Sequence, residues 1–205
     1  MTEATPTAGM FDLAPQARLM ARIAEGIADD RLDAPTPCSE FRVEQLLAHV
    51  VHLSRAFQDV ARKNLGPVTE GAPGSDIPKL PDDWRTQLPG HLDGLVEAWR
   101  DPAAWAGETQ AGGFTMPGEV AATVVLDELL LHGWDLARAT GQEYAPAPAD
   151  VETCHGLVAT FAGLPPGEGP FGPPVAVPDD TPLLDRVLGL SGRDPRWTRT
   201  GPGGA

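Results

Sequence analysis

The sequence is poor in cysteine, with only Cys38 and Cys154 among 205 residues. Two distant thiols do not make the disulfide framework that small secreted domains need. The first residues, Met-Thr-Glu-Ala-Thr-Pro, lack the basic and apolar regions of a secretory signal. No run of about 18 uncharged apolar residues is present, which argues against a membrane span. We therefore expect a cytoplasmic protein with two reduced thiols.

Basic residues are also scarce. The chain has 15 Lys and Arg against 29 Asp and Glu, which gives a formal net charge of −14. Binding to phosphate backbones requires clustered Lys and Arg, and the basic residues here are scattered. We expect neither nucleic acid nor membrane as a partner. A small-molecule substrate is expected instead, and a homodimer remains open.

Proline and glycine divide the chain into helix-length segments. The 22 Pro and 23 Gly concentrate in four stretches, at 65–81, 101–118, 145–149 and 163–182. Apolar residues recur at helical spacing between them, which predicts four long helices, at 12–30, 43–63, 83–100 and 116–140. Two shorter helices are expected near 150–162 and 182–190. We find no internal repeat and no strand ladder.

These segments predict an all-α protein. Residues 10–145 are expected to form an up-down four-helix bundle. Residues 146–205 would form a short helical and extended appendage that packs on the bundle, with a disordered end at Thr200–Ala205.

The last long helix carries the clearest chemical signal. At about 100° per residue, Glu128 and His132 lie about 40° apart on one helical face, and Asp135 lies about 20° to the other side of Glu128. The rest of this helix is apolar almost all round, which is typical of a buried helix. Buried carboxylates and imidazoles must be paired or bound to a metal. His49, at the edge of the apolar stripe of the helix at 43–63, can supply a third donor.

Other interpretations of these residues remain. Glu128 and His132 can form a buried hydrogen bond that only fixes the register of the bundle. Asp135 can accept a hydrogen bond from a ligand imidazole, which we favour, act as a fourth ligand, or pair with Arg138. Cys38 is expected to be a small buried packing residue.

Several remaining histidines have no assigned role. His52 lies further toward solvent than His49. His91 and His155 fall outside the apolar stripes and are expected at the surface. No catalytic residue is assigned beyond the three candidate ligands.

Several segments together resemble one known family. They are Pro35–Cys38, Leu46–Val50, Met116–Glu119, Glu128–Gly141, Phe171–Val175 and Leu188–Pro195. They are similar to the DinB/YfiT-like metal-binding bundles, in the branch of the mycothiol-dependent maleylpyruvate isomerase N-terminal domain. The resemblance implies an up-down four-helix bundle with an open divalent metal site, usually zinc or nickel. It implies His49, Glu128 and His132 as the ligands.

The resemblance also carries differences. The founding isomerase of the family has a separate C-terminal domain, whereas about 60 residues follow the bundle here. Phe41 and Arg42 stand where relatives often have Trp and Thr, and we expect this change to affect the helix start rather than the site.

Three protein ligands leave metal positions open, as in catalytic zinc sites. A low-molecular-weight, mycothiol-like thiol bound there would become a thiolate and add to an electrophilic carbon, in an isomerase or an S-transferase. Two rival functions remain. Two His and one carboxylate also form the triad of non-haem Fe(II) oxygenases, although these usually sit on β-barrels. The other rival is a bundle that binds a metal or small molecule without catalysis.

Overall fold

The computed structural model describes residues 9–70, 79–165 and 168–199. Its long helices are α1 (Ala14–Glu25), α2 (Val43–Arg62), α4 (Trp84–Arg100) and α6 (Gly118–Thr140). Shorter elements lie between and after them: a 3-10 turn η1 (Asp29–Arg31), α3 (Pro67–Glu70), α5 (Pro102–Trp105), β1 (Glu108–Ala111), β2 (Phe114–Pro117), α7 (Pro148–Phe161) and α8 (Leu183–Leu190). The predicted disordered end, 200–205, lies outside the described residues.

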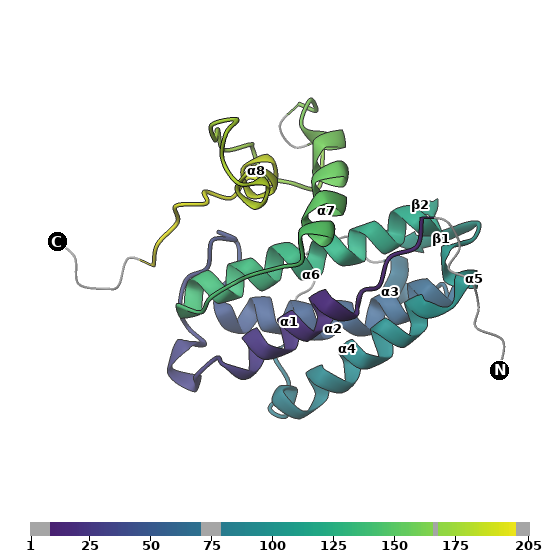
Figure 1. Cartoon of the computed structure of the whole chain (residues 1–205). Helices are drawn as coiled ribbons and strands as arrows, with labels where there is room; N and C mark the ends of the chain where they lie inside the picture. Colours follow the sequence, from purple (N-terminus) through teal and green to yellow (C-terminus); the bar gives the residue numbers. More distant parts are fainter. Residues whose placement is uncertain (1–8, 71–78, 166–167, 200–205) are drawn as a thin grey trace.

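The four long helices form a bundle, which confirms the predicted fold class (Figure 1). Helix α1 packs on α4 and α6, and α2 packs on the same two helices from the opposite side. Gln16 at the start of α1 contacts Leu129 in the middle of α6, and Ile23 near its end contacts Gln142 just after α6, so these two helices are parallel. Arg85 at the start of α4 contacts Ile27 just after α1, and Val60 near the end of α2 contacts Thr109 of β1, which precedes α6, so α4 and α2 run opposite to them. The four directions are therefore up, down, down, up, so α2 and α4 are parallel rather than alternating as expected, because the long connection between them lets the chain return to the same end of the bundle.

Helix α6 is the buried centre of the molecule. Its Leu126, Leu129, Leu130 and Leu136 are completely inaccessible to solvent. Partners surround it, since α1, α2 and α7 all pack against it. The all-round apolar pattern predicted such burial, because a helix enclosed by neighbours has no face left for water.

Two local details differ from the sequence prediction. The first helix ends at Glu25 rather than near residue 30, because Gly26 follows and glycine is a poor helix former. One short antiparallel hairpin, β1–β2, is present where no ladder was expected. Gly112 and Gly113 both have positive φ at its two-residue turn, a conformation that glycine adopts without strain.

The C-terminal segment packs on the bundle over helix α6. Helix α7 rises from α6, and α8 packs against α7 above the later part of α6 (Figure 1). The chain after α8 returns to the bundle, where Arg138 of α6 donates a hydrogen bond to the Trp197 carbonyl (2.8 Å). In the described part of the chain, no helix is long and apolar enough to cross a lipid bilayer.

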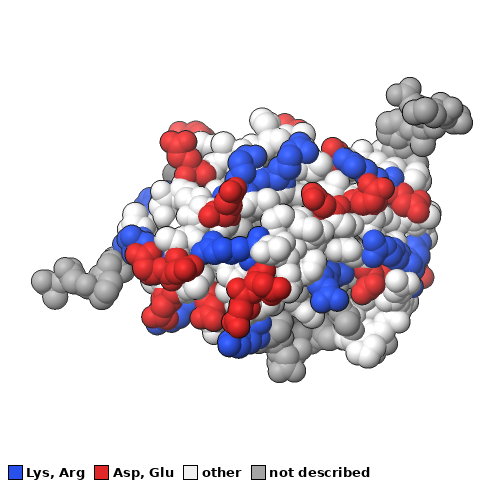
Figure 2. Space-filling model, turned by 90° about the horizontal axis from the view of Figure 1, so that it is seen from below, with Lys and Arg blue, Asp and Glu red and all other residues white. Residues whose placement is uncertain are grey.

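The charged surface is mixed on the face seen from below. Figure 2 shows Lys and Arg side chains interspersed with Asp and Glu there, rather than gathered into one stripe. A surface of this kind does not supply the concentrated positive charge that phosphate backbones require.

Candidate metal centre

His49 reaches the centre from the second turn of α2. That helix begins after Arg42, whose backbone N–H donates to the Gln45 side chain (2.9 Å) and closes a capping arrangement. The neighbouring Leu46, Leu47 and Val50 are buried in the core. They fix the rotation of the helix, so that the His49 ring, 22% exposed, faces α6.

Glu128 and His132 meet this ring from α6. Glu128 Oε2 lies 3.3 Å from His49 Nε2 and 3.1 Å from His132 Nε2. The two imidazole rings are 5.0 Å apart at their centres and nearly perpendicular. The structure thus brings together the three residues that the sequence nominated as ligands; their role as ligands stays a prediction.

The spacing of these donors fits a small divalent cation. One ligand atom from each residue lies within 4.8 Å of the other two. Donors around a tetrahedral ion at about 2.0–2.2 Å stand about 3.4 Å from each other. The two distances to Glu128 Oε2 are close to that value. Two imidazole nitrogens and one carboxylate oxygen are also a donor set that zinc accepts.

Electrostatics in the metal-free site favour charged groups. Burial works against ionised Glu128, but hydrogen bonds from His132 and His49 outweigh it and hold the pKa of Glu128 well below its usual range. Burial would lower the pKa of His132, yet hydrogen bonds to Asp135 and Glu128 raise it to about 9. Both ring nitrogens of His132 face carboxylates, so the imidazolium form satisfies both. A positive charge is therefore already favoured at this point.

Asp135 supports His132 from the opposite side of the ring. Its Oδ2 accepts a hydrogen bond from His132 Nδ1 (3.2 Å) and from Arg193 Nη2 (3.0 Å). The carboxylate is completely buried, and although burial opposes ionisation, Arg193 and His132 hold the pKa of Asp135 below its usual value. Of the predicted partners, Arg138 is not the one observed. The hydrogen bond to Nδ1 is the arrangement that orients a ligand imidazole.

Arg193 is a residue that the sequence analysis did not nominate. It follows α8, where Gly192 has a φ of 82° and the Arg193 N–H returns to the Leu188 carbonyl (2.8 Å). This is the usual glycine-terminated helix end. A Cβ at Gly192 would lie 3.1 Å from the Gly172 backbone, so the glycine also permits close approach of two chain segments. The Leu-Ser-Gly-Arg sequence signals such a helix end, but nothing local to it points to Asp135.

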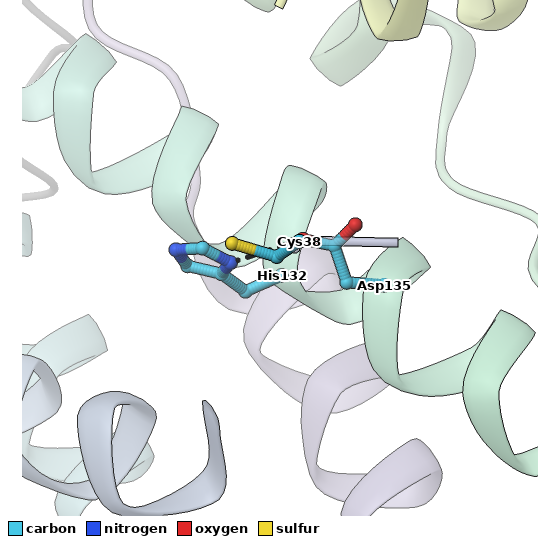
Figure 3. A group of neighbouring side chains, drawn as sticks. All are labelled: Cys38, His132 and Asp135. Atoms are coloured by element: carbon cyan, nitrogen blue, oxygen red, sulfur yellow. Dashed lines mark hydrogen bonds and ion pairs between the residues drawn. The ribbon is translucent and has the colours of Figure 1, made fainter. Parts of the chain in front are cut away.

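Cys38 lies on the same side of His132 as Asp135. Figure 3 shows its sulfur beside the imidazole, with Cys38 coming from the loop before α2 and the other two residues from α6. Sγ, the His132 ring and Asp135 also fall within metal-binding distance of each other. However, burial and then the charge of Asp135 raise the pKa of the Cys38 thiol to about 11. Arg193 already neutralises Asp135, so this second group is poorly suited to a cation.

A pocket of about 500 Å³ opens beside the three candidate ligands. One wall comes from the loop before α2 and from residues 127–132 of α6, and the other from residues 170–173 and 191–193. Cys38 lines it and is half-buried, rather than the buried packing residue that was expected. The C-terminal segment therefore encloses the candidate centre as well as packing on the bundle.

Phe41 also lines this pocket, so the expectation that this position affects only the helix start was wrong. Its ring stacks on His49 at 5.7 Å with an interplanar angle of 22°. Only Arg42 behaves as predicted, at the start of α2. His52 is exposed and does not line the pocket, and His91 and His155 are half-buried outside it.

Comparison with known proteins assigns the chain to a family. The family model of the mycothiol maleylpyruvate isomerase N-terminal domain matches residues 13–137 of the sequence. The chain belongs to this family. The match confirms the family inferred from the sequence motifs, and it spans α1 to α6 with all three candidate ligands.

Matches to relatives of this chain extend past the bundle. Two uncharacterized proteins of Mycobacterium tuberculosis, from strains CDC 1551 / Oshkosh and ATCC 25618 / H37Rv, are each 30% identical over 192 residues. The alignment covers 86% of this chain and 92% of theirs. Because residues 1–145 make up less than this share of the chain, the alignment extends past the bundle into the C-terminal segment.

Solved structures of the family show the same fold. The chain is similar to the crystal structure of the mycothiol-dependent maleylpyruvate isomerase, with a TM-score of 0.58 and 16% identity. A histidine-to-alanine mutant of that enzyme gives a TM-score of 0.57. Each match covers 74% of this chain and 70% of the other. Identity this low supports a common fold and carries no substrate over to this family member.

Proposed function

We propose that this protein binds a divalent metal, zinc in the first place and nickel as the alternative, through His49, Glu128 and His132. We propose further that it uses the metal to activate a low-molecular-weight, mycothiol-like thiol for isomerisation or S-transfer. The observation that carries the proposal is the convergence of three donor atoms within 4.8 Å at the edge of an open pocket.

The donor set favours a reactive over a purely structural site. Structural zinc is usually closed by four protein ligands, whereas three ligands leave room for an exogenous one. When bound, the metal would lower the pKa of a coordinated thiol from about 8.5, so that thiolate is present at neutral pH. The pocket of about 500 Å³ gives such a thiol and a second substrate space beside the site.

The chain's own residues orient and shield the reactants. Asp135, held by Arg193, accepts a hydrogen bond from His132 Nδ1. This orients the ring so that Nε2 is directed at Glu128 and His49. Phe41 and Leu131 line the pocket next to the ligands and keep water from part of it. We assign no general acid or base.

The proposed reaction forms a carbon–sulfur bond. Addition of the thiolate to an activated double bond places sulfur on one carbon and takes up a proton on its neighbour. If the adduct is kept, the outcome is S-transfer. If the central bond rotates and the thiol is eliminated with loss of that proton, the outcome is isomerisation with the thiol returned.

Cobalt(II) substitution tests the proposal, with N-acetylcysteine as the probe thiol. We expect one cobalt per chain and a sulfur-to-cobalt charge-transfer band that saturates on thiol addition. His49→Ala should lose both signals. His52→Ala removes an exposed imidazole from the same helix and should keep them.

Two results would refute the assignment. One is full cobalt occupancy in His49→Ala. The other is a cobalt protein whose spectrum does not respond to thiol, which would favour a metal-binding bundle without thiol chemistry.

A further inference from the structure

The pocket beside the candidate ligands contains few arginine or lysine side chains. Among the described residues that line it, Arg193 is the one arginine or lysine. The segments outside the description, 1–8, 71–78, 166–167 and 200–205, contain neither residue in their sequence. No other Lys or Arg of the chain is therefore in place to meet a ligand there.

Arg193 is already committed to groups of the protein. Its Nε and Nη2 lie 3.4 and 3.0 Å from the two oxygens of Asp135, and Nη1 donates to the Ser191 carbonyl (3.1 Å). The Arg193 side chain is only 11% exposed, and its carboxylate partner is completely buried. A ligand carboxylate would have to displace a buried one, which breaks an ion pair without solvent to compensate.

Acidic and apolar groups make up much of the remaining wall. Glu40 and Glu128 line the pocket, and Glu40, which has no part in the proposed metal site, would repel a dianionic ligand. Two aromatic rings face it from opposite walls: Phe41 stacks on His49, while Phe171 packs edge-on against Phe161. The other apolar contributors are Leu131, Pro37, Pro170 and Pro173.

We infer that the electrophile accepted by this pocket is an uncharged molecule with an apolar or aromatic face, rather than a dicarboxylate. This inference rests on the proposed function, because it names the second substrate of the same thiol reaction. A neutral ligand can bury apolar surface against Phe41, Leu131 and Phe171 without needing a cation. A dicarboxylate would lose its hydration and gain no unpaired arginine or lysine from the walls, while the thiol takes the open metal position in the proposed reaction.

An unreactive ligand pair tests the walls separately from catalysis. Dimethyl phthalate and phthalate share one aromatic ring and differ by two negative charges. Isothermal titration with the full-length, metal-free chain should show at least about tenfold tighter binding of the diester. Equal or tighter binding of phthalate would overturn the inference.

Three variants locate the binding. Phe41→Ala should weaken diester binding about 2- to 12-fold, the worth of one aromatic contact. Phe114→Ala is the matched control, because Phe114 is 67% exposed on β2, outside the pocket. Ser39→Lys adds an unpaired cation at an exposed pocket position and should tighten phthalate binding. Loss of diester binding in Phe114→Ala but not in Phe41→Ala would also overturn the inference.

A reaction assay keeps this inference distinct from the proposed function. The zinc-loaded chain with N-acetylcysteine should consume diethyl maleate faster than maleate, after correction for the uncatalysed rates. Faster turnover of maleate would refute the substrate class and leave the thiol chemistry intact. Turnover of neither compound, with dimethyl phthalate still bound, would refute the thiol chemistry and leave the ligand preference of the pocket.

Discussion

The two sides of the His132 ring offer a comparison within one residue. On the Nε2 side, the ring meets Glu128 and His49, whose side chains are 31% and 22% exposed. On the Nδ1 side, it meets Asp135 and Cys38, where the carboxylate is completely buried. Both sides gather donor atoms at metal-binding distances, yet only the Nδ1 side contains a cation of its own, Arg193.

This difference separates a site that can accept an ion from one that is already neutralised. Asp135 forms an ion pair with Arg193 and also accepts a hydrogen bond from His132 Nδ1. Burial and Asp135 also keep the Cys38 thiol protonated at neutral pH, since they raise its pKa to about 11. The Nε2 side has no arginine or lysine of its own and faces the pocket. A group of potential ligands therefore has to be judged by its existing partners as well as by its distances.

Metal affinity should separate the two sides most strongly. His49→Ala removes a donor on the Nε2 side and should lower zinc affinity by more than about 100-fold, beyond the usual cost of losing an outer partner of a ligand. Cys38→Ser alters the Nδ1 side and should leave the affinity unchanged. Competition titration against a zinc chelator gives both values. Equal losses in the two variants would show that both sides share the ion.

The free energy of unfolding, unlike metal affinity, should depend mainly on the Nδ1 side of His132. Arg193→Met leaves Asp135 buried with only His132 as partner, and should cost about 3 kcal/mol, near the lower end for breaking a buried ion pair. The free energy of unfolding in urea, measured on metal-free protein, gives the effect. Arg196→Met is the control, because its side chain is 86% exposed and exposed pairs contribute about 0–1 kcal/mol.

A double variant tests whether the cost comes from the pair. Arg193→Met with Asp135→Asn should lose less stability than the sum of the two single variants, since no uncompensated charge then remains. Strict additivity would mean that the two residues act independently, which contradicts the contacts described above.

The sequence sufficed for the bundle because local periodicity determines which faces are buried. The predicted helices at 43–63, 83–100 and 116–140 agree with α2, α4 and α6 within a few residues. Helical spacing likewise placed Glu128, His132 and Asp135 on one face, where the structure has them in contact. Such features depend on residues no more than one heptad apart.

Some contacts that depend on how other segments return to the site were missed. Asp135 and Arg193 are 58 residues apart, and their contact depends on how α7 and α8 return the chain to α6. The stacking of Phe41 on His49 depends on the loop that precedes α2. Neither contact has a period or a motif in the sequence. The parallel course of α2 and α4 is of the same kind, because it is set by the long connection between them.

The reactivity of the Cys38 thiol should differ less than zinc affinity or the free energy of unfolding does. Because the pKa of Cys38 is raised to about 11, its thiolate fraction at pH 8 should be about 100-fold below that of an ordinary thiol of pKa 9.0. Alkylation of metal-free protein by iodoacetamide should be correspondingly slow at pH 8 and accelerate about tenfold for each pH unit until about pH 11. Mass spectrometry of a Cys154→Ala variant follows Cys38 alone.

Free N-acetylcysteine under the same conditions is the reference for this rate. A Cys38 that reacts as fast as the reference at pH 8 would mean that its thiolate is stabilised in the protein. The Nδ1 side of His132 would then offer an anionic sulfur as well as a carboxylate, and its donors would compete with those on the Nε2 side for a metal ion. Slow alkylation with the expected pH dependence instead leaves Cys38 as a neutral lining residue, as its burial beside Asp135 predicts.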